Sequence, residues 1–166
     1  MLTISQATPQ DLLVVRQLFW EYLQWLNDKL NQAFHFTFDV DTAVEQSMDD
    51  VTIFLPPKGR FLLAIDDTGV AGCACMRTIG PGLAEVKRVY VRPAHRRNGV
   101  ARGLIQALIL DLRQSGYARV RLDTGFFMPE AQKLYQSLGF EEIAPYPESE
   151  VPEDMRQHFI FMELPL

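Results

Sequence analysis

The clearest chemical signal in the sequence is a short basic loop that leads from an apolar segment into a helix. The loop and the first helical residues read Arg92-Pro93-Ala94-His95-Arg96-Arg97-Asn98-Gly99-Val100-Ala101-Arg102. A helix N-terminus presents unpaired backbone N–H groups and about half a positive charge, so phosphates bind there readily. Gly99 allows close approach of the backbone, Ala101 keeps the first turn slim, and the arginines add charge-assisted donors. The pattern predicts a cradle for a phosphate or pyrophosphate; the alternative is a plain left-handed turn with solvated arginines.

The charge distribution supports an anion site at this loop. The chain has a formal net charge of −5, which argues against a general nucleic-acid surface. No Asp or Glu occurs from Val86 to Leu110, a window that holds six of the 16 lysines and arginines. These six are Lys87, Arg88, Arg92, Arg96, Arg97 and Arg102. A local basic cluster in an acidic protein indicates a site for a particular anion, although a solvated basic face has the same composition.

The loop matches neither the Rossmann fingerprint nor the P-loop motif, because it lacks their glycine patterns. Instead Arg96-x-x-Gly99-x-Ala101 resembles the acetyl-CoA-binding motif R/Q-x-x-G-x-G/A of the GNAT N-acetyltransferases. A second segment, residues 131–140, reads AQKLYQSLGF and resembles the A-x-x-L-Y-x-x-x-G-F signature of the same family. The two segments occur in the expected order. The resemblance covers residues 60–164 well and the N-terminal helices only in layout.

The resemblance implies a fold and a set of cofactor contacts. The fold would be α/β (α+β), a single acyl-CoA N-acyltransferase domain with a mixed, mostly antiparallel sheet flanked by helices. Backbone groups of Val89, Tyr90 and Val91 would contact the pantetheine and the thioester carbonyl of acetyl-CoA. Amides of the loop and helix start would hold the pyrophosphate; these residues are Arg96, Arg97, Asn98, Gly99, Val100, Ala101 and Arg102. Strand 89–91 would splay from the strand near 121–124, and the cofactor arm would enter the gap.

The resemblance also implies direct acetyl transfer to an amine, with acetyl-CoA as co-substrate and no metal. Tyr135 would return a proton to the leaving thiolate, unless it is only an aromatic packed on a short helix. Glu85 is the candidate general base, with a solvated strand carboxylate as the alternative, and Asp123 is a second candidate. The three histidines, His35, His95 and His158, are expected to be structural or exposed, although His95 could line the phosphate loop.

One position departs from the family pattern. Met128 stands where many members carry an Asn that helps to hold the cofactor, so that contact would be lost or supplied elsewhere. The apolar run at 126–128 could instead border the acyl group or simply pack in the core. The acceptor pocket is expected between the first two helices, their linker and the last hairpin. The acidic segment 146–154 there would suit a cationic amine, or could be a solvated loop.

The helices and strands that must position these residues are predicted from the spacing of apolar residues and from the glycines and prolines between them. Apolar residues at spacings of three and four from Leu12 to Leu30 predict a first helix, which begins near Thr8-Pro9. A second helix is expected over 41–48. Strands are expected over 2–6, 60–65, 70–78, 83–91, 119–124, 140–144 and 158–164, with further helices over 99–115 and 129–138. The meander at 60–91 implies antiparallel pairing, and the later strand-helix-strand unit implies a parallel crossover.

Length and composition fit one globular domain over residues 1–166. Within it we expect an N-terminal helical acceptor-side region (1–58), an acetyl-CoA-binding core (60–144) and a C-terminal loop and strand (145–166). No apolar run is long enough to cross a membrane and no secretory signal stands out, so a cytoplasmic protein is expected. Cys73 and Cys75, two residues apart on a strand, are expected to be reduced core residues.

The sequence therefore predicts an acetyl-CoA-dependent N-acetyltransferase that acts on a primary amine of a small molecule or peptide. Nucleic acid and membrane are not expected partners, and a homodimer through a sheet edge is possible. The main alternative is a non-catalytic acyl-CoA-binding module. A nucleotide-binding domain and a transferase of longer acyl groups are further alternatives.

Overall fold

The computed structural model describes residues 1–166 and is built on a seven-stranded sheet with the order β1-β2-β3-β4-β5-β7-β6. The strands are β1 (Thr3–Gln6), β2 (Gly59–Asp66), β3 (Gly69–Gly80), β4 (Leu83–Val91), β5 (Arg119–Gly125), β6 (Glu141–Ile143) and β7 (Phe159–Pro165). Every neighbouring pair is antiparallel except β4 and β5, which are parallel. The predicted mixed, mostly antiparallel sheet is therefore confirmed.

Four α-helices accompany the sheet: α1 (Leu12–Phe34), α2 (Val40–Asp49), α3 (Val100–Gln114) and α4 (Pro129–Ser137). The first helix differs from the prediction at both ends. Residues Pro9–Asp11 form a 3-10 turn, in which the Asp11 carboxylate accepts hydrogen bonds from the Thr8 backbone and hydroxyl at 2.7 and 2.8 Å. The helix then continues four residues beyond Leu30 and ends at His35, which adopts a left-handed backbone conformation.

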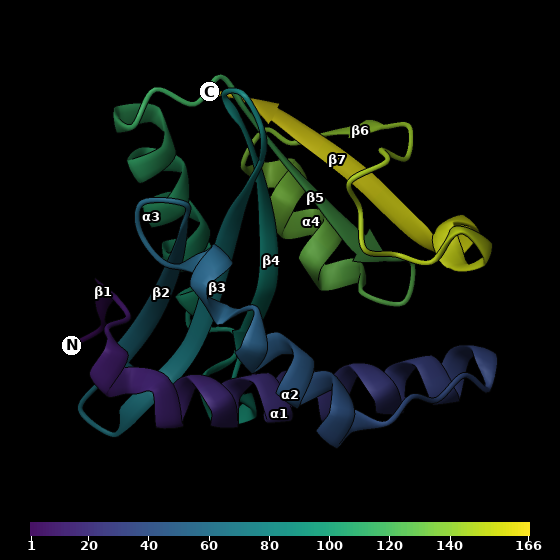
Figure 1. Cartoon of the computed structure of the whole chain (residues 1–166), viewed down its shortest axis with the longest axis horizontal. Helices are drawn as coiled ribbons and strands as arrows, with labels where there is room; N and C mark the ends of the chain where they lie inside the picture. Colours follow the sequence, from purple (N-terminus) through teal and green to yellow (C-terminus); the bar gives the residue numbers. More distant parts are fainter.

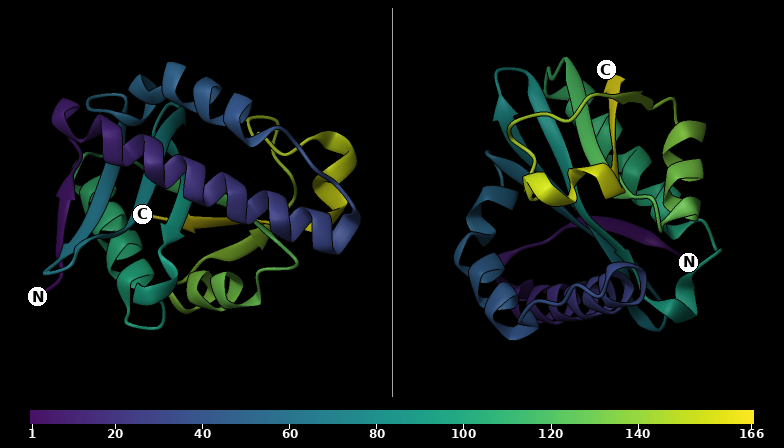
Figure 2. Two further views of the ribbon diagram at one scale, coloured as in Figure 1. Left: turned by 90° about the horizontal axis from the view of Figure 1, so that it is seen from below. Right: turned by 90° about the vertical axis from the view of Figure 1, so that its right-hand side faces the viewer.

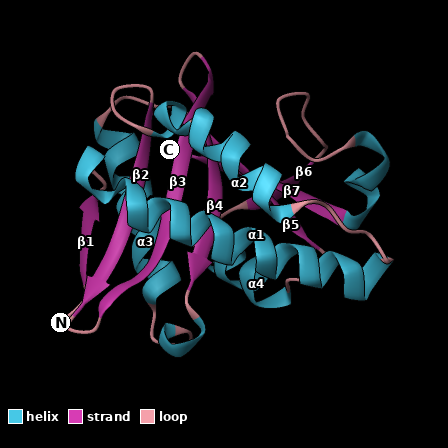
Figure 3. Ribbon diagram, turned by 60° about the horizontal axis from the view of Figure 1, so that its bottom comes forward, coloured by secondary structure: helices cyan, strands magenta, loops and turns pink.

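The helices form two layers on opposite faces of the sheet (Figure 1 and Figure 2). Alternating strand residues divide between them, as the pleat requires. Leu62 and Ala64 of β2 pack with α3, whereas Phe61 and Leu63 pack with α1. Cys73 and Cys75 are both free and buried on the α1 side, as expected. Figure 3 shows α1 and α2 crossing in front of the strands.

The sheet opens at its centre. Pairing between β4 and β5 involves only residues 83–85 with 119–121, while β4 continues to Val91 without a partner on that side. An extra residue in β4 forms a bulge against β3, because Tyr90 pairs with Cys73 and Lys87 pairs with Cys75. Arg88, within this bulge, has a positive φ of 51°. The bulge increases local twist, and the predicted splay of the two strands is confirmed (Figure 1).

Candidate functional site

The loop that follows β4 forms a cradle of free backbone amides. The N–H groups of residues 97–102 donate to no acceptor within the protein, and the first helical donor is Gly103, 2.9 Å from the Gly99 oxygen. Arg97 and Gly99 both have positive φ, 62° and 77°. A Cβ added at Gly99 would meet no atom within 4 Å, so the space beside the Gly99 Cα is open. Successive free amides at a helix start fit the pyrophosphate that the sequence predicted there.

Two arginines of the predicted cradle hold the loop rather than face a ligand. The Arg96 side chain folds back, donates to the Val91 oxygen at 2.9 Å and lies 5.8 Å from the Trp25 ring. Arg92 makes a bidentate ion pair with Glu21 of α1, in which Nη2 and Nε donate to the two carboxylate oxygens at 2.8 and 3.0 Å. These contacts fix the backbone from which the amides project, so the basic cluster noted in the sequence serves more than one purpose.

The remaining loop contacts tie the cradle to its neighbours. His95 Nδ1 lies 2.9 Å from the Asp66 carboxylate at the end of β2. Arg102, in the first turn of α3, donates to the Ser137 hydroxyl of α4 at 2.7 Å. Arg97, Asn98 and Gly99 are exposed. Their amides are therefore reachable from solvent in a loop whose position is already fixed.

The end of β4 presents backbone to the gap while its side chains pack on both faces. Tyr90 is buried with the α1 layer and meets Tyr22 edge-on, with ring centroids 6.3 Å apart. Val89 and Val91 pack against the α3 layer. Because β5 has diverged here, the backbone of these three residues has no strand partner on the gap side. This is the arrangement required for backbone recognition of an extended arm.

Tyr135, the candidate proton donor, lies in α4, the helix that follows β5. It is 6 % exposed and packs edge-on to Phe140 at 5.8 Å. Its hydroxyl makes no hydrogen bond within the protein and is not fully enclosed. Burial, together with Tyr22 and Asp123, raises the pKa of Tyr135 far above that of a free phenol. The hydroxyl is therefore protonated and available as a donor.

Glu85 is completely buried, which corrects the alternative of a solvated strand carboxylate. Its carboxylate accepts hydrogen bonds from Arg77 Nε at 2.9 Å and from the Tyr146 hydroxyl at 2.7 Å. Burial and the adjacent Glu85 raise the pKa of Tyr146, so this phenol stays protonated as the donor. No local pattern predicts this network, because Arg77 and Tyr146 come from β3 and from the loop after β6.

A second carboxylate, Asp123 of β5, lies beside the same network. It accepts a hydrogen bond from the Ser149 hydroxyl at 3.2 Å and lies 3.8 Å from Lys87 Nζ. Lys87 also lies 3.2 Å from Glu150 and 4.0 Å from Glu85. Burial opposes the charge on Lys87, but the three carboxylates outweigh it and raise the pKa of the ammonium group. Charges of both signs thus meet at the mouth of the splay.

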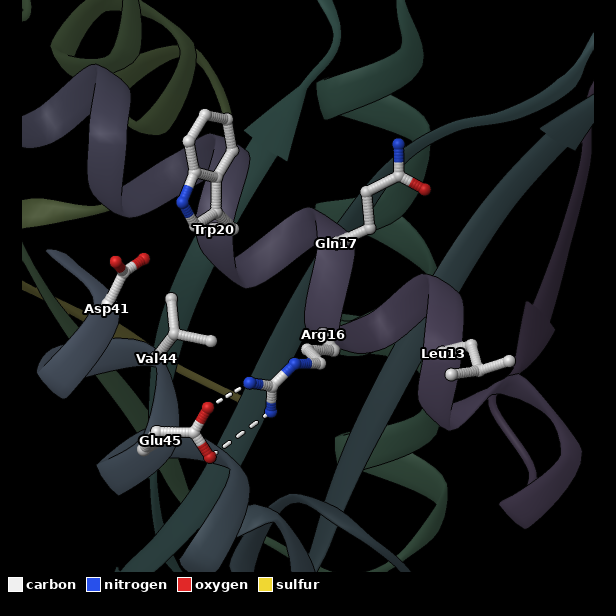
Figure 4. Close-up of a pocket in the computed structure, with 7 residues that line it drawn as sticks. All are labelled: Leu13, Arg16, Gln17, Trp20, Asp41, Val44 and Glu45. Carbon is white, nitrogen blue, oxygen red and sulfur yellow. Dashed lines mark hydrogen bonds and ion pairs between the residues drawn. The ribbon is translucent and has the colours of Figure 1, made fainter.

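Aromatic residues of α1, on the expected acceptor side, lie in two separate places. Phe34 stacks on His158 at 4.1 Å and meets Phe127 edge-on at 5.8 Å. These contacts join the end of α1 to the residues that follow β5 and precede β7. Trp20 instead lines a groove of about 310 Å³ on the outer side of α1 and α2 (Figure 4). An ion pair between Arg16 and Glu45 crosses that groove, which is separate from the gap between β4 and β5.

Met128 directly precedes α4, and its side chain makes no capping hydrogen bond to the helix. Its sulfur accepts from the Thr124 hydroxyl at 3.8 Å. Gln132, one turn into the helix, donates its side-chain amide to the Gly125 oxygen at 2.8 Å. The turn between β5 and α4 is thus held by side chains other than the missing Asn.

A parallel strand pair that diverges beside a cradle of free amides defines an acyl-CoA N-acyltransferase fold. Residues 15–140 match the acetyltransferase (GNAT) family, and the chain belongs to that family. The confirmed family membership makes it an acyltransferase, and the non-catalytic alternative is not favoured.

Relatives and solved structures agree with this assignment. An uncharacterized N-acetyltransferase of Schizosaccharomyces pombe is 32% identical over 87% of this chain and 85% of its own length. A protein named IAA acetyltransferase from Azospirillum brasilense is 30% identical over 99% of this chain and 97% of its own. PaiA N-acetyltransferase of Thermoplasma acidophilum, solved with coenzyme A, has the same fold, with a TM-score of 0.76, 15% identity and coverage of 100% and 99%.

Two further findings concern metal and membrane. No group of three or more His, Cys, Asp and Glu side chains is arranged to hold a metal ion. None of the helices combines the length and the apolar character needed to cross a membrane.

Proposed function

We propose that the protein transfers the acetyl group of acetyl-CoA directly to a primary amine of a small molecule or peptide. The observation that carries the proposal is the run of six free amides, residues 97–102, at the point where β4 and β5 have separated. A cluster of N–H donors at a helix N-terminus suits a pyrophosphate, and the unpaired strand backbone beside it suits the amide groups of the pantetheine arm. Family membership supports the acyl-group chemistry.

The residues of β4 and the loop would bind and orient the thioester. Backbone N–H groups at the unpaired end of β4 would polarise the carbonyl and stabilise the charge that develops on its oxygen. The bulge at Arg88 helps to turn this part of β4 away from β5. Holding both reactants side by side supplies much of the rate in such direct transfers.

Tyr135 would donate its proton to the departing thiolate. Its support is a hydroxyl with no competing partner and a pKa raised mainly by burial, which keeps the proton on the oxygen at neutral pH. An acid whose proton is free to transfer accelerates departure of a basic leaving group.

Two carboxylates are candidates for the base that removes a proton from the incoming ammonium. Glu85 is the candidate from sequence; because both its oxygens accept hydrogen bonds and no part of it is exposed, it would act through Tyr146 or a water. Asp123 is 14% exposed and lies within electrostatic reach of Tyr135. Glu85→Gln and Asp123→Asn distinguish them, since loss of the true base removes the acidic limb of the kcat/KM profile against pH.

The first test is calorimetric titration with acetyl-CoA, run beside CoA, ATP and NAD. We expect binding of the two CoA species and not of ATP or NAD. Gly99→Glu should abolish it, because the new carboxylate would stand among the free amides. Gly116→Glu is the matched control: its φ of 80° is close to the 77° of Gly99 and its surroundings are equally open, but it follows the other end of α3. Equal loss in both variants, or preference for ATP or NAD, would refute the proposed cradle.

A further inference from the structure

Arg88 contacts both α2 and the loop of residues 144–152, two parts of the molecule that are expected to border the acceptor. From the bulge in β4, its guanidinium lies 5.1 Å from the ring centroids of both Phe19 and Phe54. It donates to the Ser47 hydroxyl of α2 at 2.9 Å. Its other neighbour is Glu150, on the loop of residues 144–152 between β6 and the last 3-10 turn. Only 13% of the side chain is exposed.

The charge on Arg88 is poorly compensated in comparison with its neighbours. Arg77 donates to the Glu85 carboxylate at 2.9 Å, and Arg92 has both carboxylate oxygens of Glu21 within 3.0 Å. The nearest carboxylate to Arg88, that of Glu150, is 3.9 Å away, beyond direct hydrogen bonding. Arg88 Nε is buried and has no partner at all. A guanidinium removed from water normally has an anion that matches its planar fork.

Glu150 is shared among three cations. Its carboxylate lies 3.2 Å from Lys87, 3.6 Å from Arg77 and 3.9 Å from Arg88. It is also the most exposed acid of the cluster, at 45%, against 14% for Asp123 and 0% for Glu85. Those other two acids are fixed on β5 and β4, whereas Glu150 lies on an irregular loop. With Glu150 turned away, three cations would face two carboxylates, and one positive charge would lack a counterion.

We infer that the amine acceptor carries a carboxylate, which pairs with Arg88 and replaces Glu150 at the cation cluster. The inference rests on the proposed acetyl transfer and narrows its acceptor to an amino acid or a similar small amino-carboxylate. Glu150 already shows that a carboxylate fits between Lys87 and Arg88. Lys87 and Arg88 directly precede Val89, where β4 has no β5 partner, so a carboxylate held by them would lie next to the proposed thioester site.

The experiment measures kcat/KM for a panel of amines by quantifying the acetylated product. The panel compares an α-amino acid with its carboxamide and with its decarboxylated amine, once for an aliphatic and once for an aromatic side chain. Rates are compared per concentration of neutral amine, since the carboxylate changes the basicity of the amine. We expect the acid to be preferred over its amide by about tenfold or more, as one charge-assisted pair provides. O-phosphoethanolamine is included to separate a carboxylate site from a phosphate site.

Two variants test the residues. Arg88→Met should lower the acid-to-amide ratio about tenfold, with Arg88→Lys retaining part of it. Glu150→Gln should raise the ratio about two- to threefold, because it removes the internal competitor. A merely structural role for either residue would change acid and amide together and leave the ratio unmoved. Because Glu150 is exposed, its variant remains informative if Arg88→Met fails to fold.

The outcomes separate this inference from the proposed function. Failure of the wild-type protein to bind acetyl-CoA in calorimetry would refute the proposed function itself. If acetyl-CoA binds but no carboxylate in the panel is acetylated faster than its amide, the inference is overturned. Preference for O-phosphoethanolamine over the amino acids, or a ratio that neither variant changes, overturns it equally.

Discussion

At the scale of single residues, the site depends on side chains whose surroundings fix their protonation. Tyr135 stays neutral chiefly because charging it would place an anion in a buried position near Asp123. Lys87 stays charged despite burial because three carboxylates lie within 4.0 Å of its nitrogen. A protonated phenol and a charged ammonium group are thus both maintained near Asp123 at neutral pH.

Replacing Tyr135 by Phe tests the proton donor. We expect kcat to fall by about 100-fold or more, the usual value of general acid catalysis, with acetyl-CoA affinity unchanged. Tyr117→Phe is the control, since that hydroxyl lies 2.6 Å from Thr78 Oγ1, outside the candidate site. Stopped assays that quantify the acetylated product would measure kcat for both variants and the wild type. An unchanged kcat in Tyr135→Phe would rule out the acid role.

The direction of the Tyr135 pKa shift predicts the alkaline side of the rate profile. A raised pKa keeps the group protonated at a higher pH than the ordinary value of about 10. The activity should therefore remain flat between about pH 8.5 and 10, where an unshifted tyrosine would begin to lose its proton. A profile of kcat against pH in this range measures it, and a decline that disappears in Tyr135→Phe would contradict the prediction.

The two cysteines should be chemically silent in the folded protein. Burial raises the pKa of Cys73 to about 12 and that of Cys75 well above its usual range, so almost no thiolate exists at neutral pH. Ellman's reagent should detect no thiol in the native protein and two per chain in guanidinium. Fast labelling without denaturant would show that this part of the sheet opens.

At the scale of elements, α3 both begins the cradle and anchors the sheet. Leu104, Ile105 and Leu108 are completely buried against the strands, while Leu110 on the same helix is 57% exposed. The free amides at residues 97–102 are held in place by this packing on one side and by the Arg92–Glu21 pair on the other. We therefore expect ligand affinity at the cradle to depend also on residues that hold the loop without contacting the ligand.

Leu108→Ala should destabilise the fold by about 2–5 kcal/mol, because it removes a fully buried side chain and leaves a cavity. Leu110→Ala is its partner on the exposed side of the helix and should cost less than about 0.5 kcal/mol. Urea denaturation of both variants gives the comparison. Similar losses in the two would mean that α3 does not pack as described.

The elements also show what local sequence could predict. The strand Leu83–Val91 has the predicted bounds, and α3 differs by one residue at each end, because glycines, a proline and clear periodicity mark them. The bulge at Arg88 and the buried pairing of Glu85 could not be predicted, since they depend on β3 and on the loop after β6. The motif of the loop at residues 96–101 is local and can be recognised in the sequence, whereas the cation cluster depends on long-range contacts and cannot.

At the scale of the whole molecule, two half-sheets are joined by one short parallel contact. Strands β1 to β4 form one half, and β5, β7 and β6 form the other. Only three register pairs connect β4 with β5, so a ligand that spans the separation would link the halves. Such a ligand should raise the free energy of unfolding of the whole domain.

Acetyl-CoA at a hundredfold excess over its Kd should stabilise the folded protein by about 2.7 kcal/mol, if it binds only the native state. For a chain of this size that corresponds to a rise in Tm of about 5–10 °C. Differential scanning fluorimetry measures the shift, with Gly99→Glu expected to show none. A shift of equal size in that variant would place the ligand elsewhere.

The position of β7 has a consequence for synthesis on the ribosome. Although β7 is the last strand along the chain, it lies between β5 and β6, and all seven of its residues pair with β5. Because the ribosome adds about 5–20 residues per second, β7 is translated a few seconds after β5. During that interval one edge of β5 is open to other nascent chains. The second half-sheet therefore forms only when the end of β7 emerges, and chaperones that cover exposed strand edges would act in that window.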